Sequence, residues 1–222
     1  MDPDATAVKT AKDESAPPAR AGRKVTLRAR AARQDQTRER IVAAAVDLHE
    51  SVGPLATTIT AIAERAGVQR LTVYRHFPTE EDLFTACTYH HFGLHPPPDL
   101  TAWETIADPM QRAETGLGDL YRYWADIETM AASVLRDHEI APERVGAGLI
   151  AFMNAAADLL TAPWRSTGDR RVVRGVIGHL VHFRTWQTLV PGQGLHPDEA
   201  VAASLAMITH ATRLDAHPGN AR

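Results

Sequence analysis

The sequence has little of what several protein classes require. Its 222 residues include a single cysteine, Cys87, so no disulfide forms within the chain, which argues against a disulfide-stabilised secreted scaffold. No apolar run approaches the roughly 18 residues of a membrane-spanning helix. The N-terminal stretch MDPDATAVKTAKDESAPPARAG also lacks the apolar core of a secretion signal. We therefore expect a globular protein of the cytoplasm, without membrane contact.

The motifs of common enzyme and cofactor sites are also missing. The sequence contains no phosphate-binding glycine loop, nucleophile elbow or HExxH zinc motif. The cluster His90, His91 and His95 and the pair His179 and His182 have no cysteine or well-placed carboxylate beside them. We expect no metal, no cofactor and no catalytic residues, and an enzyme is only a distant alternative.

The net charge of −3 is small, but the charges are unevenly distributed. Residues 20–40 carry eight Arg and Lys side chains against two acidic ones, a local charge of +6. A basic segment on an otherwise acidic chain favours a polyanion as partner; the alternative is a solvated tail without a partner. Residues 1–33 hold almost no large apolar side chains, so we expect a disordered basic arm there.

Beyond the arm, apolar residues recur at helical spacing between glycines and prolines, and no stretch alternates as a strand would. The fold class predicted is therefore all-α. The triple proline at 96–98 favours a division into one domain at residues 34–92 and another at residues 93–222. In the second domain the pattern predicts helices over residues 100–106, 109–124, 127–138, 142–164, 169–189 and 197–214.

The first domain is predicted to begin with a helix from residue 36 that ends at Gly53-Pro54, and two short helices joined by a tight turn follow as the second and third helices. Thr58 is placed to cap a helix over residues 59–65, Gly67 ends that helix, and a further short helix follows. The small Ala63 and Ala66 let two helices cross closely, as in a helix-turn-helix.

A fourth helix is predicted to follow Pro78. Thr79 and Asp82 have the spacing of a capping box at its start. The helix would then carry Leu83 and Cys87 on its apolar face, which joins it to the core of the first domain.

The third of these helices carries side chains suited to DNA. With Val68, Val73 and Phe77 turned inward, helical geometry leaves the polar side chains at the outer surface. Two sets of contacts follow: base edges would be met by Gln69, Arg70 and Leu71, and phosphates by Thr58, Thr72, Tyr74, Arg75 and His76. The alternative for Tyr74 is a core position with its hydroxyl at the rim.

The order of residues from 36 to 84 resembles the N-terminal region of the TetR family of transcriptional regulators. The matching segments are 41–53, Thr58-Ile59, Ile62-Ala63, Ala66-Gly67-Val68, Thr72-Val73-Tyr74, His76-Phe77-Pro78 and Asp82-Leu83. The resemblance implies a homodimer that binds a palindromic operator in double-stranded DNA, most often as a repressor. It also implies a C-terminal domain that binds a small effector.

Four positions depart from the family pattern. His49 stands where an aromatic Phe is common, and Glu80 stands where a Lys frequently meets a phosphate. Gln69 replaces a Ser, so a helix cap is lost, and Leu71 replaces a small residue. We expect the operator preference of this protein to depend on Gln69 and Leu71.

The resemblance implies that an effector releases DNA by moving the fourth helix. Large apolar side chains that would line a cavity for a small hydrophobic or aromatic effector are Trp103, Tyr121, Trp124, Met130, Phe152, Met153 and Trp186. Polar anchors would be Asn154, Arg122 and His182. The alternative for each apolar residue is a plain core position. For the whole chain, the alternative is a DNA-binding regulator without an effector, controlled by a protein partner or by its own abundance.

The last two predicted helices have apolar residues on more than one face. In the first, Val172 and Val176 lie on one stripe and Val173 and Ile177 on another, so this helix has two surfaces to pack against. The family dimerises through its two C-terminal helices, and we expect a homodimer through the last two helices here.

Overall fold

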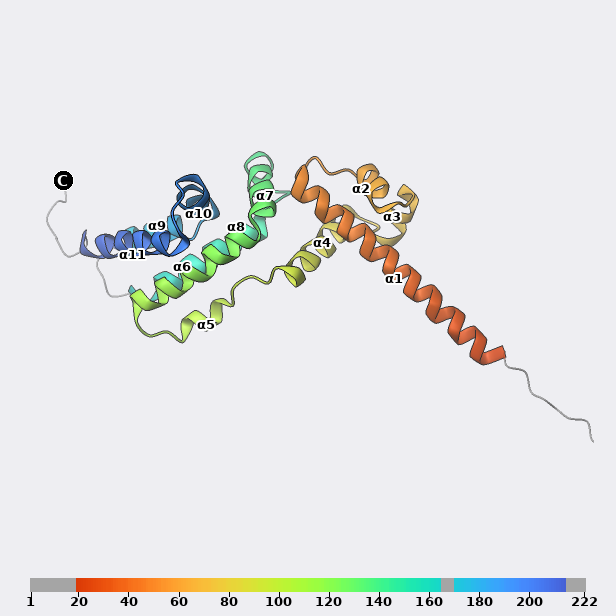
Figure 1. Ribbon diagram of the computed structural model, residues 1–222, viewed down its shortest axis with the longest axis horizontal. Helices are drawn as coiled ribbons and strands as arrows, with labels where there is room; N and C mark the ends of the chain where they lie inside the picture. Colours follow the sequence, from red (N-terminus) through yellow and green to blue (C-terminus); the bar gives the residue numbers. More distant parts are fainter. Residues whose placement is uncertain (1–18, 165–169, 215–222) are drawn as a thin grey trace, which may run out of the picture. The chain divides into compact units, whose positions relative to one another are not determined.

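The computed structural model describes residues 19–164 and 170–214, which are mostly helical with no strand among them (Figure 1). The all-α prediction is therefore confirmed. The chain divides into two units, residues 1–40 and residues 41–222. Within the described residues, no helix is long and apolar enough to cross a membrane.

Helix α1 (Ala19–Ser51) spans the boundary between the two units. It begins inside the segment 1–33 for which the composition predicts disorder, and residues 1–18 lie outside the described part of the chain. Ala and Arg make up most of residues 19–33, and both are strong helix formers. Helix propensity therefore extends α1 back through a segment that has no core of its own to bury.

A small core unites the C-terminal part of α1 with three further helices, α2 (Ile59–Ala66), α3 (Arg70–His76) and α4 (Glu80–Leu94). Its buried residues include Ile41, Ile62, Val73, Phe77 and Leu83. Val73 is completely buried and Val68 is half-buried, so the inward face predicted for α3 is confirmed.

The predicted ends of α2 and the predicted start of α4 are also confirmed. Thr58 Oγ1 accepts a hydrogen bond from the Ala61 backbone at 3.1 Å, and Gly67 ends α2 with φ of 64°. Thr79 and Asp82 form a capping box, with each side chain accepting from the backbone N–H of the other residue at 3.1 Å. Gln69 makes no side-chain cap at the start of α3, as expected where a Ser is lost.

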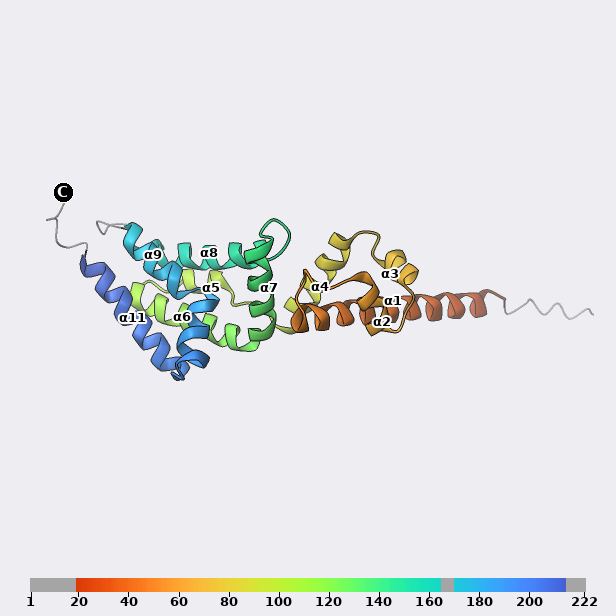
Figure 2. The same cartoon turned by 90° about the horizontal axis from the view of Figure 1, so that it is seen from above.

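The remaining helices surround a second core. They are α5 (Leu100–Glu104), α6 (Pro109–Asp126), α7 (Glu128–Ile140), α8 (Ala147–Thr161), η1 (Ala162–Trp164), α9 (Arg170–Leu180), α10 (Phe183–Gln187), η2 (Thr188–Gly192) and α11 (Pro197–Leu214). Figure 2 shows α8 beside α9, and α11 packs against both α6 and α9. The core of this part includes Trp103, Leu120, Trp124, Leu160 and Phe183.

Two of the predicted helices differ from the observed ones. The helix predicted to start at residue 142 starts at Ala147. The residues before it form a turn, in which the Val145 carbonyl accepts a hydrogen bond from His138 Nδ1 at 2.6 Å. The helix predicted over 169–189 is broken after Leu180, and its expected first residue, Asp169, lies outside the described residues.

The break after Leu180 is stabilised by side chains distant in sequence. His182 is extended, with ψ of 136°, and its Nδ1 accepts from the Arg184 backbone at 3.1 Å to begin α10. Tyr121 and Trp124 of α6 donate to the carbonyls of Leu180 and Val181, each at 3.2 Å. Polar atoms of α6 thus satisfy backbone groups that a break would otherwise leave unpaired.

Candidate functional site

The outer face of α3 carries the side chains predicted to meet DNA. Gln69, Arg70, Tyr74 and Arg75 are exposed, and Leu71 is 77% exposed. Thr72 and His76 are half-buried. The helix therefore presents an amide, guanidinium groups and an apolar side chain together, which suits acceptors on base edges and the thymine methyl in a major groove.

Thr58 lies exposed at the start of α2. Its hydroxyl oxygen already accepts from the Ala61 backbone. The hydroxyl hydrogen stays available as a donor, so the same side chain can cap α2 and bond a phosphate oxygen.

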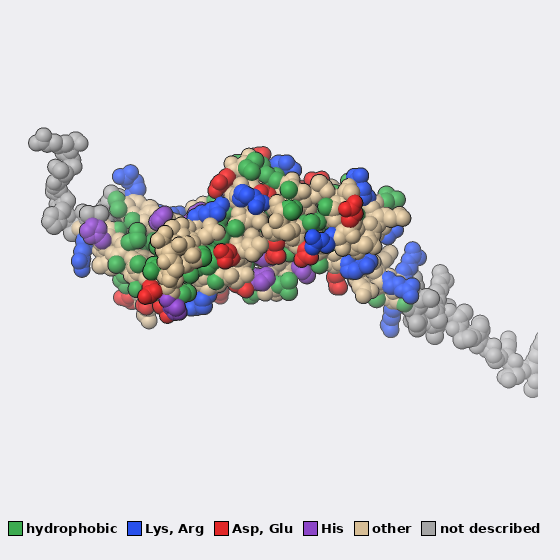
Figure 3. Space-filling model, turned by 45° about the horizontal axis from the view of Figure 1, so that its top comes forward, with side chains coloured by type: hydrophobic (Ala, Val, Ile, Leu, Met, Phe, Trp, Pro, Cys, Tyr) green, Lys and Arg blue, Asp and Glu red, His purple; other side chains and the backbone are tan. Residues whose placement is uncertain are grey.

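The charges around this face are mixed. Arg70 and Arg75 form no ion pair with other described residues, whereas Arg65 pairs with Asp47 at 3.2 Å. The first turn of α4 carries Glu80 and its acidic neighbours. These carboxylates stabilise the N-terminus of the helix but would repel a DNA phosphate. On the face seen in Figure 3, basic and acidic side chains are interspersed. Attraction to DNA would therefore come from a few arginines, not from a broad positive surface.

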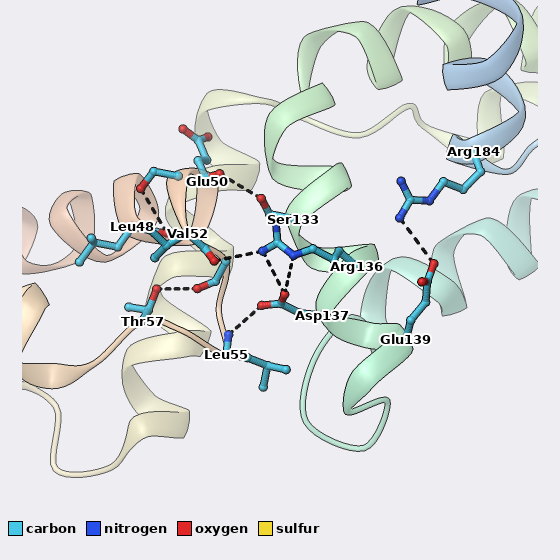
Figure 4. A network of polar contacts seen from close by, with 12 residues as sticks. Leu48, Glu50, Val52, Leu55, Thr57, Ser133, Arg136, Asp137, Glu139 and Arg184 are labelled. Carbon is cyan, nitrogen blue, oxygen red and sulfur yellow. Dashed lines mark hydrogen bonds and ion pairs between the residues drawn. The ribbon is translucent and has the colours of Figure 1, made fainter. Parts of the chain in front are cut away.

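Three side chains of α7 hold the end of α1 and the loop after it. Ser133 Oγ donates to the Glu50 carbonyl at 3.0 Å, and Arg136 Nη2 donates to the Val52 carbonyl at 3.1 Å (Figure 4). The Leu55 backbone N–H donates to Asp137 Oδ2 at 2.8 Å. We call Ser133, Arg136 and Asp137 the α7 clamp. It connects α7 directly to the end of α1 and to the loop that leads into α2.

Gly53 lies against the clamp. Its φ of 94° falls in the left-handed region, and a Cβ built there would lie 2.6 Å from Asp137 Oδ2 and still closer to Arg136. Arg136 Nε also donates to Asp137 Oδ1 at 3.0 Å, which keeps the two charged groups paired beside the glycine. Both backbone conformation and space thus require glycine at this position.

A cavity of about 400 Å³ lies beside the clamp, between α1, α4, α7 and α8. Its walls are mainly apolar and aromatic, and they include Val46, Phe84, Tyr123, Met130 and Phe152. The volume falls within the roughly 300–1,000 Å³ typical of small-molecule sites. Because α1 and α4 both contribute, a ligand bound here would touch helices of the DNA-binding region directly.

The polar groups in the cavity wall are largely uncharged. Burial lowers the pKa of His49 to about 4, an effect partly opposed by Asp137, and burial lowers the pKa of His91 as well. Burial raises the pKa of the Cys87 thiol to about 12, so this buried cysteine remains a neutral thiol. The exposed Glu143 and Arg144 contribute charges of opposite sign.

The burial of His49 predicts a pH-dependent stability. Its folded pKa lies below the unfolded value of 6.5, so the unfolded chain binds the proton more tightly. His49 thus contributes about 3 kcal/mol that is fully present above pH 6.5 and lost as the pH falls towards 4. We expect the free energy of unfolding, measured with urea between pH 7 and 4, to fall less steeply in His49→Phe. An equally steep decline in the variant would contradict this; His196→Phe, at an exposed histidine, is the control.

The structure places two of the seven side chains predicted to line a ligand cavity in the cavity wall and the other five elsewhere. Met130 and Phe152 do line the cavity, whereas the other five do not contribute to its wall. Trp103 is buried with its Nε1 donating to Asp119 at 2.8 Å, and Tyr121 and Trp124 bond the helix break. Met153 and Trp186 also lie in the core.

The predicted polar anchors lie elsewhere. Asn154 is exposed, and Arg122 is exposed and pairs with Asp119. His182 lines a separate hollow of about 430 Å³ beside α9 and α10. Across the described part of the chain, no three His, Cys, Asp or Glu side chains are grouped closely enough to hold a metal ion.

The sequence reasoning missed His49, Cys87 and His91 as cavity residues. For His49 there was a signal, since it replaces the Phe that is common at its position in the resembling family. For the other two, nothing in the local pattern shows which face of α4 will border open space.

A short exposed helix crossing a second one at a tight glycine turn defines a helix-turn-helix DNA-binding protein. Residues 41–87 match the model of the bacterial regulatory proteins of the tetR family. The match is confined to this N-terminal region, which is therefore similar to the DNA-binding region of TetR-family transcriptional regulators. No curated protein sequence matches the chain closely enough to count as a relative.

Solved structures share the fold at low sequence identity. A TetR-like transcriptional regulator from Rhodococcus sp. RHA1 matches with a TM-score of 0.56 at 15% identity, over 80% of this chain and 96% of that one. A TetR transcription regulator from Haloarcula marismortui ATCC 43049 matches with a TM-score of 0.52 at 15% identity, over 82% and 98%. A Clostridium perfringens protein described as a fatty acid metabolism regulator gives 0.57 at 14% identity, over 78% and 97%. The likeness therefore covers the C-terminal helices as well as the helix-turn-helix.

Proposed function

We propose that this protein is a homodimeric repressor that binds a palindromic operator through α3 and is released by a small, mainly apolar effector. The observation that carries the proposal is the position of the cavity, whose wall includes α1 and α4 of the DNA-binding region. The domains we propose are a basic arm at residues 1–33, a DNA-binding domain at 34–92 and an effector and dimer domain at 93–222. Such a protein acts on chromosomal DNA, so we place it in the cytoplasm.

The DNA contacts we propose follow from exposure on α3. Gln69, Arg70 and Leu71 would read base edges, because they lie exposed at its N-terminal end. The phosphate contacts would come from Thr58, Thr72, Tyr74, Arg75 and His76, which lie at the start of α2 or further along α3. The exposed Tyr74 favours its DNA role over the core alternative.

We expect Arg70→Ala and Thr72→Ala to affect operator binding in different ways. Loss of a base contact costs about 1–3 kcal/mol at one operator position and relaxes the preference there. Loss of a phosphate contact weakens binding to all sequences alike and reduces the salt dependence. Binding to a library of operator variants distinguishes the two; an unchanged preference in Arg70→Ala would remove Arg70 from base readout.

The dimer that we propose through α9 and α11 is supported by the outer face of α11. Ala202, Ala203, Ala206 and Met207 of α11 are exposed and lie on one side of the helix, while the opposite side packs on α6 and α9. Small side chains let two helices of different subunits approach closely. Two copies joined here would present two α3 helices to successive major grooves.

The effector would act through the walls of its cavity. A ligand between α4 and α7 changes how α4 and the α7 clamp hold the end of α1, and hence the spacing of the two heads. By linkage, an effector that lowers operator affinity binds the DNA complex less tightly by the same factor.

The test has two stages. The purified protein is first footprinted on the DNA upstream of its own gene, and compounds are then screened for release of that DNA. A protected palindrome and a releasing compound are the expected results. Absence of any DNA binding would contradict the regulator itself. DNA binding that no small molecule alters would favour the alternative without an effector.

A further inference from the structure

Two buried histidines in the cavity wall have unused hydrogen-bonding capacity. His49 is only 8% exposed, and neither of its ring nitrogens bonds to another described residue. His91 is 7% exposed, and its Nε2 is buried without a partner in the described structure. Buried polar groups are normally paired, because leaving one unpaired costs free energy. An unpaired imidazole in a cavity wall is therefore a candidate partner for a ligand, provided that its nitrogen is accessible from the cavity.

His49 is the better placed of the two to meet a ligand. Nε2 of His91 is sealed from open space, whereas the nitrogens of His49 are unpaired but not completely buried. The ring of His49 lies 6.0 Å from that of Phe84, centroid to centroid, so an aromatic surface adjoins it. His49 thus places a polar group beside an aromatic ring in a mainly apolar wall.

The charges in the cavity wall further limit the chemical class of ligand that can bind. The thiol of Cys87 is neutral in its buried position, and the described wall offers no buried cation or anion to neutralise a charged ligand. The charged wall residues Glu143 and Arg144 are exposed, so an ion moved into the buried part of the cavity would lose its hydration without a buried partner of opposite charge. A hydroxyl group suits an imidazole of either tautomer, because it can both donate and accept a hydrogen bond.

We propose that the cavity binds an uncharged, mainly apolar ring compound carrying a hydroxyl group, and that this hydroxyl bonds to the imidazole of His49. The ligand would thereby be held by α1 itself, one residue before the Glu50 carbonyl that Ser133 of the clamp binds. The inference rests on the proposed function only in treating this cavity as the effector site. It assigns to His49 the role of selecting the ligand's polar group.

Three probes of similar shape test the ligand class by titration calorimetry on the full chain without DNA. They are 4-propylphenol, propylbenzene and 4-propylbenzoate. We expect 4-propylphenol to bind about 3- to 10-fold more tightly than propylbenzene, the gain from one net hydrogen bond. The benzoate should bind at least about 100-fold more weakly than the phenol, because it carries a charge into the cavity.

Variants of His49 test the assigned contact. In His49→Phe the preference for the phenol should disappear or reverse, because its hydroxyl would be buried without a partner, while propylbenzene still binds. His49→Gln, which keeps a hydrogen-bonding group, should retain part of the preference, and His196→Phe should retain all of it. Far-UV circular dichroism and operator binding check that each variant is folded.

The results that would contradict the proposed ligand class differ from those that would contradict the proposed DNA-binding function. Tightest binding of the benzoate, an unchanged phenol preference in His49→Phe, or no binding of any probe would each reject the ligand class proposed. A protein that still protects its operator would at the same time leave the DNA-binding function intact.

Discussion

The variant Gly53→Ala should lower the free energy of unfolding by about 3 kcal/mol. Holding an alanine in the left-handed region costs about 1–2 kcal/mol, and the added Cβ would collide with Asp137 and Arg136. Relief of the collision moves the clamp and weakens its hydrogen bonds to Leu55 and Val52, at about 1 kcal/mol each. Thermal unfolding should show a midpoint about 6–12 °C below that of the wild type.

Gly67→Ala provides the matched control. Gly67 also has a positive φ, of 64°, but a Cβ there would meet nothing within 4 Å. Its cost should be confined to the backbone, about 1–2 kcal/mol. Equal losses in the two variants would show that the contact between Gly53 and the clamp contributes nothing to stability.

The variant Met207→Glu should dissociate the proposed dimer. Met207 is 47% exposed on the outer face of α11, so a glutamate there is tolerated in a single chain but would lose its hydration between two. Because each chain would then bind DNA with one head, operator affinity should fall by at least about 100-fold. Analytical ultracentrifugation should give the 24.2 kDa of one chain.

Ile140→Glu is the control for this change. Ile140 is an exposed apolar residue at the end of α7, outside the proposed interface. The substitution introduces the same charge and should leave both mass and operator affinity unchanged. A Met207→Glu protein that remains dimeric would place the subunit contact on another surface.

The helix-turn-helix could be predicted from the sequence because its signals are local. Thr58, Gly67 and the pair Thr79 and Asp82 specify helix ends through bonds within three or four residues of themselves. The inward direction of Val73 follows from helical spacing alone. The resemblance to the TetR family then added the DNA-binding interpretation to a pattern that by itself indicates only two crossed helices.

The C-terminal region was less predictable because its critical contacts join distant residues. Tyr121 and Trp124 are residue types that often line ligand pockets. In this structure, however, they donate hydrogen bonds to backbone carbonyls some sixty residues further along the chain. The same bonds coincide with the break after Leu180, where the apolar pattern continues without interruption. The spacing of apolar residues in the sequence shows which face of a helix is apolar. It does not show whether that face contacts another helix or an open cavity.

The sequence by itself determined the helical class of this protein, the caps and turn of its helix-turn-helix, and the side chains on the outer face of α3. These depend on backbone propensity and on neighbours within one or two turns. Only the tertiary structure decided that His49 borders a cavity and that Asp137 holds the Leu55 backbone. Both depend on packing across 80 or so residues of chain, for which no local signal exists.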